Sequence, residues 1–310
     1  MPNTAAGPQS KAQTASNKIA SGVLLAVAGS IAFSGKAIIV KLAYRYGVDA
    51  VTLLMYRMLL ALPFFLLLSW WASRGKDALT GKQWLQVIFL GFIGYYLASF
   101  LDFAGLQYIS ASLERLILYL NPTIVLLMGA LLWGKKITRR QLAAFALSYC
   151  GVLLVFGHEV KLDGANVGLG ALLVFGSAAA YAVYLSYSGE LVQKLGSLRL
   201  AGLATSAACL FCIAQFAVMR PWSATQVAPE VLWLSLLNAL ACTVAPVLMV
   251  MMAIERIGAA KTAQIGMVGP MSTITMGVLV LGEPFNAWIV AGTLLVLGGV
   301  YLVSRGKAEQ

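Results

Sequence analysis

The chain is poor in the residues from which most enzymes build their chemistry. Only 11% of its 310 residues are charged, acidic residues number 11, and there is one histidine. That residue, His158, falls in a predicted loop between two halves of the chain, and no grouping of His, Asp and Ser suits a catalytic site. We therefore expect neither an enzyme nor a bound cofactor.

Cysteine and phosphate-binding motifs are equally scarce. The four cysteines all fall in apolar segments, and Cys209 and Cys212 have no histidine or further cysteine nearby to complete a metal site. The segment from Gly258 to Thr262 resembles a phosphate-binding loop, but its lysine lacks the preceding glycine and no strand comes before it. Metal binding, redox chemistry and ATP hydrolysis are not expected.

Apolar sequence is what the chain has in abundance. Hydrophobic residues make up 60% of it. Apolar runs recur between short polar loops, and each is close to the roughly 20 residues that cross about 30 Å of hydrocarbon as a helix. The sequence therefore predicts an all-α, multi-pass membrane protein with about ten transmembrane helices.

The net charge of +11 indicates membrane topology and not a nucleic-acid partner. Lys and Arg residues are spread over the loop ends instead of forming one basic stripe. If the N-terminus is cytoplasmic, most of them lie on the inner side, and the outer side holds only Lys41, Arg45, Lys161 and Arg220. By the positive-inside rule, both termini are predicted to be cytoplasmic.

Residues 106–152 and 254–300 repeat each other without a gap, at a constant spacing. Prolines and glycines coincide between the copies: Pro122 with Pro270, Gly134 with Gly282, and Gly151 with Gly299. Five spans per copy place the second copy upside down, so two inverted repeats are expected around a site near the midplane. The predicted organisation is a flexible cytoplasmic tail (1–17), a first five-helix repeat (18–157), a linker (158–166), a second five-helix repeat (167–305) and a cytoplasmic tail (306–310).

The second copy resembles the EamA family of the drug/metabolite transporter superfamily. The resemblance rests on small residues from Gly258 onward, Pro270 within a helix, Gly282 followed by Glu283, and Gly299 in a closing helix. It covers nearly the whole chain after the tail. It implies the EamA fold and a secondary transporter of the bacterial inner membrane that moves small organic metabolites. Export of amino acids or related carboxylated solutes is the leading expectation, with lipophilic-cation efflux or metabolite uptake as alternatives.

The first copy departs from this family pattern at one position. Gly134 is followed by Lys135 where the family often has glutamate, so any role of that acid rests on Glu283. Expected partners are a small-molecule substrate, membrane lipid and a coupling proton or counter-substrate, and small residues in the last span leave a homodimer open. A channel is less favoured because no ring-forming motif recurs.

Charged residues within membrane spans are costly and are functional candidates by default. Lys36, Arg57 and Arg115 all fall in the outer third of their predicted spans, and we expect them to bind a carboxylate or phosphate of the substrate. The alternative is that these long side chains reach the membrane surface or form fixed ion pairs between helices.

Acidic residues near these cations are candidates for coupling or gating. Asp102 and Glu114 are predicted to pair with the cations in the empty site, and a buried Glu114 could also couple transport to a proton. In the inverted copy, Glu255 and Lys261 lie near the inner surface and are the corresponding candidates.

Aromatic and amide side chains complete the predicted pocket. Tyr181 and Tyr184 share one face of the sixth span, and Tyr95, Tyr119 and Asn121 come from the first half. Hydroxyl-bearing rings suit an amphipathic organic solute, although any one tyrosine could equally serve packing.

Proline marks the predicted points of bending. Pro122 and Pro270 are equivalent in the two copies and interrupt helical hydrogen bonding within their spans. We expect them to act as hinges when the two halves move.

Overall fold

The computed structural model describes residues 8–134, 137–163, 166–257, 262 and 265–306. Nearly all of these residues are helical, and none of them lies in a strand. Of the apolar helical segments, 8 are long enough to cross a membrane, and Gly269–Leu281 and Ala287–Leu302 are shorter. The predicted all-α membrane fold with about ten helices is confirmed.

The first half of the chain supplies five spans. They are α1 (Pro8–Tyr44), α2 (Ala50–Ser73), a third span of α3 (Gly81–Leu90), η1 (Gly91–Leu97) and α4 (Ala98–Gly105), a fourth of α5 (Ala111–Leu118) and α6 (Asn121–Trp133), and α7 (Arg139–Asp163). The helix α1 begins within the segment predicted as a tail, and α7 continues into the segment predicted as a linker.

The second half supplies five more spans. They are α8 (Asn166–Leu195), α9 (Ser197–Met219), an eighth span of α10 (Pro229–Ala239), η3 (Leu240–Val244) and α11 (Ala245–Ile257), a ninth that includes η4 (Gly266–Val268), α13 (Gly269–Met276) and η5 (Gly277–Leu281), and α14 (Ala287–Gly306). A short turn, η2 (Trp222–Thr225), lies between α9 and α10. The π-helical segments η1 and η3 occupy the same place in the third and eighth spans.

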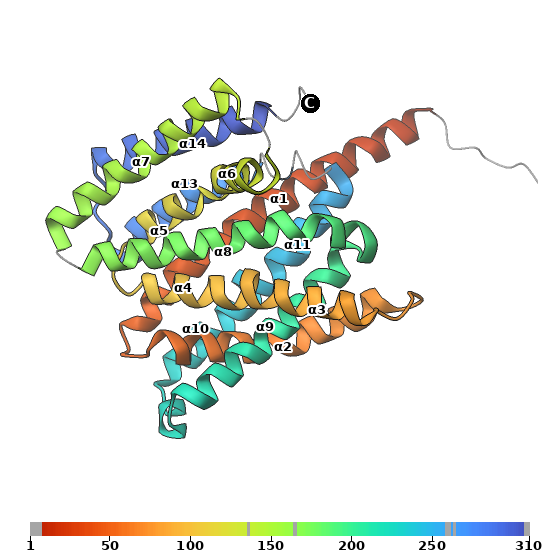
Figure 1. Cartoon of the computed structure of the whole chain (residues 1–310), viewed down its shortest axis with the longest axis horizontal. Helices are drawn as coiled ribbons and strands as arrows, with labels where there is room; N and C mark the ends of the chain where they lie inside the picture. The colour runs from red at the N-terminus through yellow and green to blue at the C-terminus, as the bar shows by residue number, and fades with distance from the viewer. Residues whose placement is uncertain (1–7, 135–136, 164–165, 258–261, 263–264, 307–310) are drawn as a thin grey trace, which may run out of the picture.

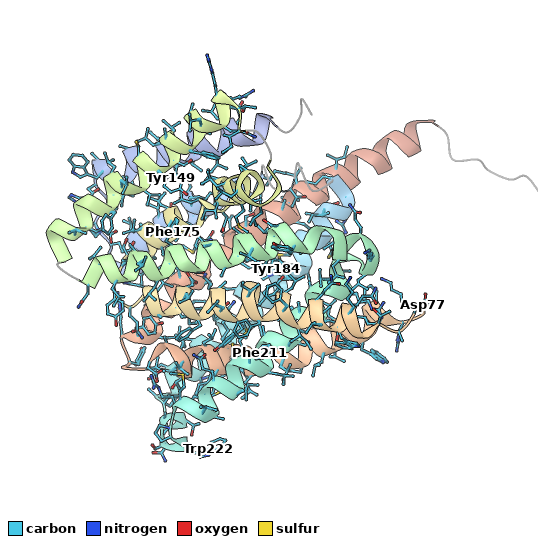
Figure 2. All side chains as sticks on the ribbon, in the orientation of Figure 1. Asp77, Tyr149, Phe175, Tyr184, Phe211 and Trp222 are labelled. Atoms are coloured by element: carbon cyan, nitrogen blue, oxygen red, sulfur yellow. The ribbon has the colours of Figure 1, made fainter. Side chains whose placement is uncertain are left out.

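The first helices of the two halves, α1 and α8, run in opposite directions (Figure 1). We call the face where α1 begins and α14 ends the terminal face, and the opposite one the distal face. Asp77 lies at the terminal face and Trp222 at the distal face (Figure 2). The opposed directions are the expected property of inverted repeats.

Packing between helices follows the same twofold relation. The helix α1 packs on α11 as α8 packs on α4, while α2 pairs with α9 and α7 with α14 across the two halves. The α7–α14 contact is close at equivalent glycines. A Cβ atom at Gly151 would lie 2.6 Å from the carbonyl oxygen of Gly292, and one at Gly299 would lie 2.6 Å from that of Ala144. Small residues therefore let these two backbones touch.

Helix boundaries have local causes. The Asp49 side chain accepts hydrogen bonds from the first N–H groups of α2, and Ser110 caps α5 in the same way. Gly134 and Gly282 end equivalent spans in left-handed conformation, with φ of 63° and 73°. The repeated glycines thus stop the same helix in both copies.

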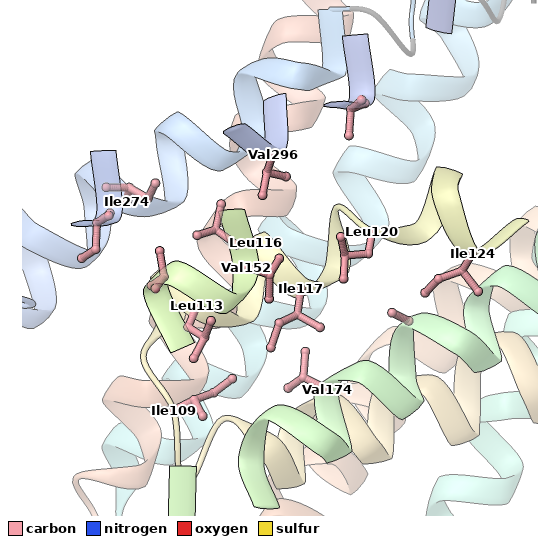
Figure 3. Close-up of a cluster of buried hydrophobic side chains, with 14 of the residues drawn as sticks. Ile109, Leu113, Leu116, Ile117, Leu120, Ile124, Val152, Val174, Ile274 and Val296 are labelled. Carbon is pink, nitrogen blue, oxygen red and sulfur yellow. The ribbon is translucent and has the colours of Figure 1, made fainter. Parts of the chain in front are cut away.

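A cluster of buried apolar side chains joins the two halves. Leu116 of α5 and Val174 of α8 belong to it together with Ile274 of α13 and Val296 of α14 (Figure 3). The fourth span is therefore held between helices of the second half.

Candidate binding site

A cavity of about 390 Å³ lies between the two halves, near the middle of the spans. Its volume is that of a small-molecule pocket. It is lined by Phe33, Lys36, Arg57, Met58, Phe65, Gly94, Tyr95, Ala98, Ser99, Asp102, Arg115, Leu118, Tyr119, Asn121, Ser177, Tyr181, Thr205, Thr243, Val247 and Val250. Most of the residues predicted to bind substrate are brought together here.

Lys36 of α1 forms the charged centre of the cavity wall. Its ammonium donates a hydrogen bond to Asp102 of α4, and it lies 3.2 Å from a carboxylate oxygen of Glu114 in α5. The Glu114 side chain is fully buried and lies behind the cavity surface, with Asp102 in front. One lysine thus pairs with two carboxylates, because a buried charge is strongly destabilising without an opposite charge beside it.

The two arginines of the cavity are held by hydroxyl and carbonyl groups of other helices. The Arg57 Nε donates to the Thr243 hydroxyl at 2.9 Å, and the Arg115 Nε donates to the Thr273 hydroxyl at 2.9 Å. Arg115 also donates to the carbonyl of Phe33 at 3.2 Å. Within the described part of the chain, neither guanidinium forms an ion pair with a carboxylate.

Three polar atoms of cavity-lining residues lack partners among the described residues. The Arg57 Nη1, the Asp102 Oδ1 and the Asn121 Oδ1 are buried without a hydrogen bond. Buried polar atoms nearly always form hydrogen bonds, so a bound solute or water can accept a hydrogen bond from the donor here and donate one to an acceptor. Arg57 is only 5% exposed, which strengthens its electrostatic pull on an anion.

A tyrosine cluster forms the aromatic wall. Tyr95 and Tyr181 line the cavity, whereas Tyr184, near the middle of α8 (Figure 2), packs behind them. The Tyr184 ring centroid lies 5.0 Å from that of Tyr95 and 5.5 Å from that of Tyr181. A Cβ atom at Gly94 would lie 2.4 Å from Tyr184, so glycine is needed for this packing. Tyr184 therefore positions the other two rings instead of facing the cavity.

The fourth span is interrupted beside the cavity. Between α5 and α6, the Tyr119 hydroxyl donates to the carbonyl of Gly266 in the second half at 2.7 Å. Asn121 donates to the carbonyl of Leu118 at 2.7 Å, and its own Oδ1 is buried without a described partner. The break thus supplies polar groups to the cavity at mid-membrane depth, where lipid would not tolerate them.

Both predicted hinge prolines lie at such breaks. Pro122 is in the first turn of α6, and Pro270 is in the first turn of α13. A proline in a first helical turn loses no intrahelical hydrogen bond. The predicted gating residues Glu255 and Lys261 cannot be placed: the Glu255 side chain and the whole of Lys261 lie outside the described part of the chain.

One sequence expectation near the site is wrong. His158 is not in a loop between the two halves, because it lies in α7, contacts Asn286 at 2.9 Å and stacks on Trp288. The error comes from ending the fifth span too early, since α7 continues to Asp163.

Thr243 and Thr273 orient the arginines and were missed by sequence reasoning. Threonine is common in apolar helices and carries no charge to mark it. One signal was available in the sequence. The positions of the second half that are equivalent to charged residues of the first half are uncharged, so polar partners for those charges had to be sought among its hydroxyl-bearing residues. At the repeat spacing, Val250, Thr262 and Ala263 correspond to Asp102, Glu114 and Arg115.

The path from the cavity to the distal face is closed by apolar packing. Val40, Leu54, Phe103, Leu106 and Ala111 are each at most 1% exposed and belong to one buried cluster. All of them lie on the distal side of the charged centre along their helices. The cavity is therefore sealed from the distal face.

Asp49 stabilises the distal surface next to this layer. It accepts hydrogen bonds from Thr52 and from the guanidinium of Arg220 in the second half. Partial burial raises the pKa of Asp49, but the hydrogen bonds from Thr52 and the charge of Arg220 outweigh burial and leave this pKa below its usual value.

Comparison with known proteins agrees with this architecture. The model of the EamA-like transporter family matches residues 20–157 and again residues 168–305. A Bacillus subtilis protein named uncharacterized transporter YcbK is 31% identical over 301 residues, which cover 95% of each chain. A WAT1-related protein of Arabidopsis thaliana is 25% identical over 319 residues, covering 93% of this chain and 90% of its own.

A solved crystal structure has the same fold, with a TM-score of 0.59 over 91% of this chain and 96% of that chain at 16% identity. The family match extends over both halves, and the relatives are aligned over nearly their whole length. This chain therefore belongs to the EamA-like transporter family of the drug/metabolite transporter superfamily, and it is a multi-pass membrane transporter.

Proposed function

We propose that this protein is a secondary transporter of small organic solutes that carry an anionic group, with amino acids and related carboxylated solutes as the leading class. The observation that carries this proposal is the pair Arg57 and Arg115. Both guanidinium groups reach the cavity without a described carboxylate partner, whereas Lys36 contacts two acids. Three cations beside two carboxylates leave one positive charge for the solute to balance.

The rest of the cavity suits an organic solute of moderate size. Tyr95 and Tyr181 on one side and Phe33 and Phe65 elsewhere provide apolar surface, and Asp102 keeps an acceptor oxygen for an amine. An amino acid presents a carboxylate, an amine and, in many cases, an apolar side chain together. A lipophilic cation would add positive charge to a site in which Lys36, Arg57 and Arg115 already outnumber the two carboxylates.

The direction we favour is export from the cytoplasm across a bacterial inner membrane. Two inverted halves around one site support alternating access, in which one half moves against the other. The positive-inside rule assigns the terminal face to the cytoplasm. A cavity sealed from the distal face fits a solute that enters from the terminal face, and a proton gradient or exchange would supply the energy.

The test is to reconstitute the protein in liposomes and measure thermal stabilisation and flux with amino acids, their derivatives and lipophilic cations. We expect a carboxylated solute to bind, and Arg57→Gln and Arg115→Gln each to weaken binding about tenfold or more. Arg199→Gln is the matched control, because Arg199 is a buried arginine that donates to the Ser73 hydroxyl and to the backbone carbonyl of Asp77, away from the cavity. Stabilisation by lipophilic cations alone would contradict the proposal.

A further inference from the structure

Glu283, which follows the ninth span, reaches across to the first half of the chain. One carboxylate oxygen accepts a hydrogen bond from the backbone N–H of Ala111 at 2.7 Å. The other oxygen accepts from the Ser112 hydroxyl at 2.7 Å and from its N–H at 3.3 Å. These donors are the first groups of α5, where unpaired N–H groups and the helix dipole favour a negative charge.

The local backbone is built to hold this carboxylate. Gly282 turns the chain back with φ of 73°, and the Glu283 N–H then donates to the carbonyl of Gly277 at 3.0 Å. A Cβ atom at Gly277 would lie 2.8 Å from a carboxylate oxygen of Glu283. Only glycine at position 277 leaves the space that the carboxylate occupies.

The helix that Glu283 binds also carries two charged residues of the binding site. Glu114 and Arg115 follow Ala111 within about one helical turn, or roughly 6 Å of rise. Arg115 is attached to Thr273 of the second half. The second half therefore holds α5 both at its distal end and beside the cavity, and in Figure 1 α5 lies next to α13.

The residue at the equivalent position of the first repeat cannot make this contact. That position is Lys135, and a lysine cannot accept hydrogen bonds from backbone N–H groups. A second carboxylate, Glu159 of α7, also binds the start of α5 through Ser110, but it belongs to the same half as α5. Glu283 thus links the two halves through a carboxylate, and the equivalent residue of the first repeat is a lysine.

We propose that Glu283 is a positioning residue that latches the distal face shut, and that its release from α5 accompanies opening toward that face and displaces Glu114 and Arg115. The inference rests on the alternating access of the proposed function, because contacts between the halves at the distal face must break when that face opens. Two other contacts join the halves there: Arg45 donates to the carbonyl of Leu281 at 2.9 Å, and Arg220 donates to the partly exposed Asp49 at 3.1 Å. The bonds of Glu283 are charge-assisted and end on fully buried residues, which makes them the stronger restraint.

The experiment measures access from the distal face to a single cysteine at position 40. Val40 is fully buried in the apolar layer between the cavity and the distal face. Val40→Cys is made in a variant whose native cysteines are replaced, and an impermeant maleimide is added to one face of the membrane at a time. With Glu283→Gln, we expect labelling from the distal face to be at least about fivefold faster.

Glu159→Gln is the matched control, and we expect it to leave the labelling rate unchanged. Gly277→Ala should reproduce the effect of Glu283→Gln without any change of charge, and Ser112→Ala should give a smaller increase. Equal labelling rates for Glu283→Gln and Glu159→Gln would overturn the latch. The labelling experiment requires no solute. Failure of the Glu283 proposal can therefore be distinguished from failure of the carboxylated-solute proposal, which depends on Arg57 and Arg115.

Discussion

Lys36 is the residue on which the charge balance of the site depends. Its ammonium contacts Asp102 and Glu114, whose side chains are 3% and 0% exposed. Replacing it with methionine leaves two buried carboxylates without their cation, which costs about 3–5 kcal/mol for a broken buried pair. We therefore expect Lys36→Met to lower the thermal unfolding temperature strongly in detergent.

The cause is tested by neutralising the acids as well. Adding Asp102→Asn and Glu114→Gln to Lys36→Met should restore most of the stability, because amides need no cation. Lys76→Met provides a control, since Lys76 binds only the carbonyl of Leu195 at the terminal face among its described contacts. A triple variant no more stable than Lys36→Met would contradict the account of this group.

We expect ionised Asp49 to contribute to the free energy of unfolding, and this contribution to be lost in acid. Its folded-state pKa is depressed by Thr52 and Arg220, so its contribution is fully present above the unfolded value of about 3.9 and is lost as the pH falls through the folded pKa. Asp49→Asn should therefore be less stable than the wild type at pH 6, and the difference should shrink as the pH falls below the unfolded value of about 3.9. Thermal unfolding at a series of pH values measures this, and a gap that does not narrow in acid would rule it out.

Sequence identified much of the cavity wall because charge is rare in membrane spans. Lys36, Arg57, Arg115 and Asp102 stand out in apolar sequence, and all four line the cavity. Glu114, also singled out by its charge, lies one layer behind. Sequence spacing fixes the face of a helix but not the depth of a side chain within the bundle, so that difference could not be predicted.

At the scale of the elements, the crossing of α7 and α14 is sensitive to added volume. Gly151→Ala and Gly299→Ala would each press a methyl group against a backbone carbonyl of the partner helix. Such overpacking costs about 1–3 kcal/mol. We expect both variants to lose thermal stability, and Gly299→Ala to lose at least as much, because its Cβ atom would also lie 2.0 Å from the Ser148 hydroxyl.

Gly157→Ala in the same helix is the control for this pair. A Cβ atom at Gly157 meets nothing within 4 Å, and alanine favours helix by up to about 1 kcal/mol. Gly157→Ala should thus preserve or raise stability in the same thermal assay. If all three variants behaved alike, close α7–α14 packing would not be the cause.

The helices themselves followed from the sequence, whereas their irregularities did not. A membrane span must satisfy its backbone internally, so long apolar runs leave little choice but helix. The π-helical segments η1 and η3 were not expected, because no proline marks η1 and a single wide turn leaves no trace in hydrophobic spacing. The glycines that end α6 and η5 could be read as stops, since they repeat at one spacing.

At the scale of the whole molecule, the inverted repeat was the property most accessible from sequence. Gapless similarity between two five-span segments dictates opposite orientations, and α1 and α8 run in opposite directions (Figure 1). Sequence could not say which face is closed, because both copies carry similar apolar residues near both faces. The charges do break the symmetry, since they lie in the first half and their equivalents are Val250, Thr262 and Ala263.

The central claim is that the cavity selects its solute through an anionic group. The most direct measurement is counterflow in proteoliposomes, with a labelled amino acid outside and an excess of either the same amino acid or its carboxamide inside. We predict that the amino acid drives accumulation of the label, that the carboxamide does not, and that Arg57→Gln with Arg115→Gln abolishes the difference. Equal accumulation with the carboxamide, or counterflow supported only by lipophilic cations, would contradict the claim.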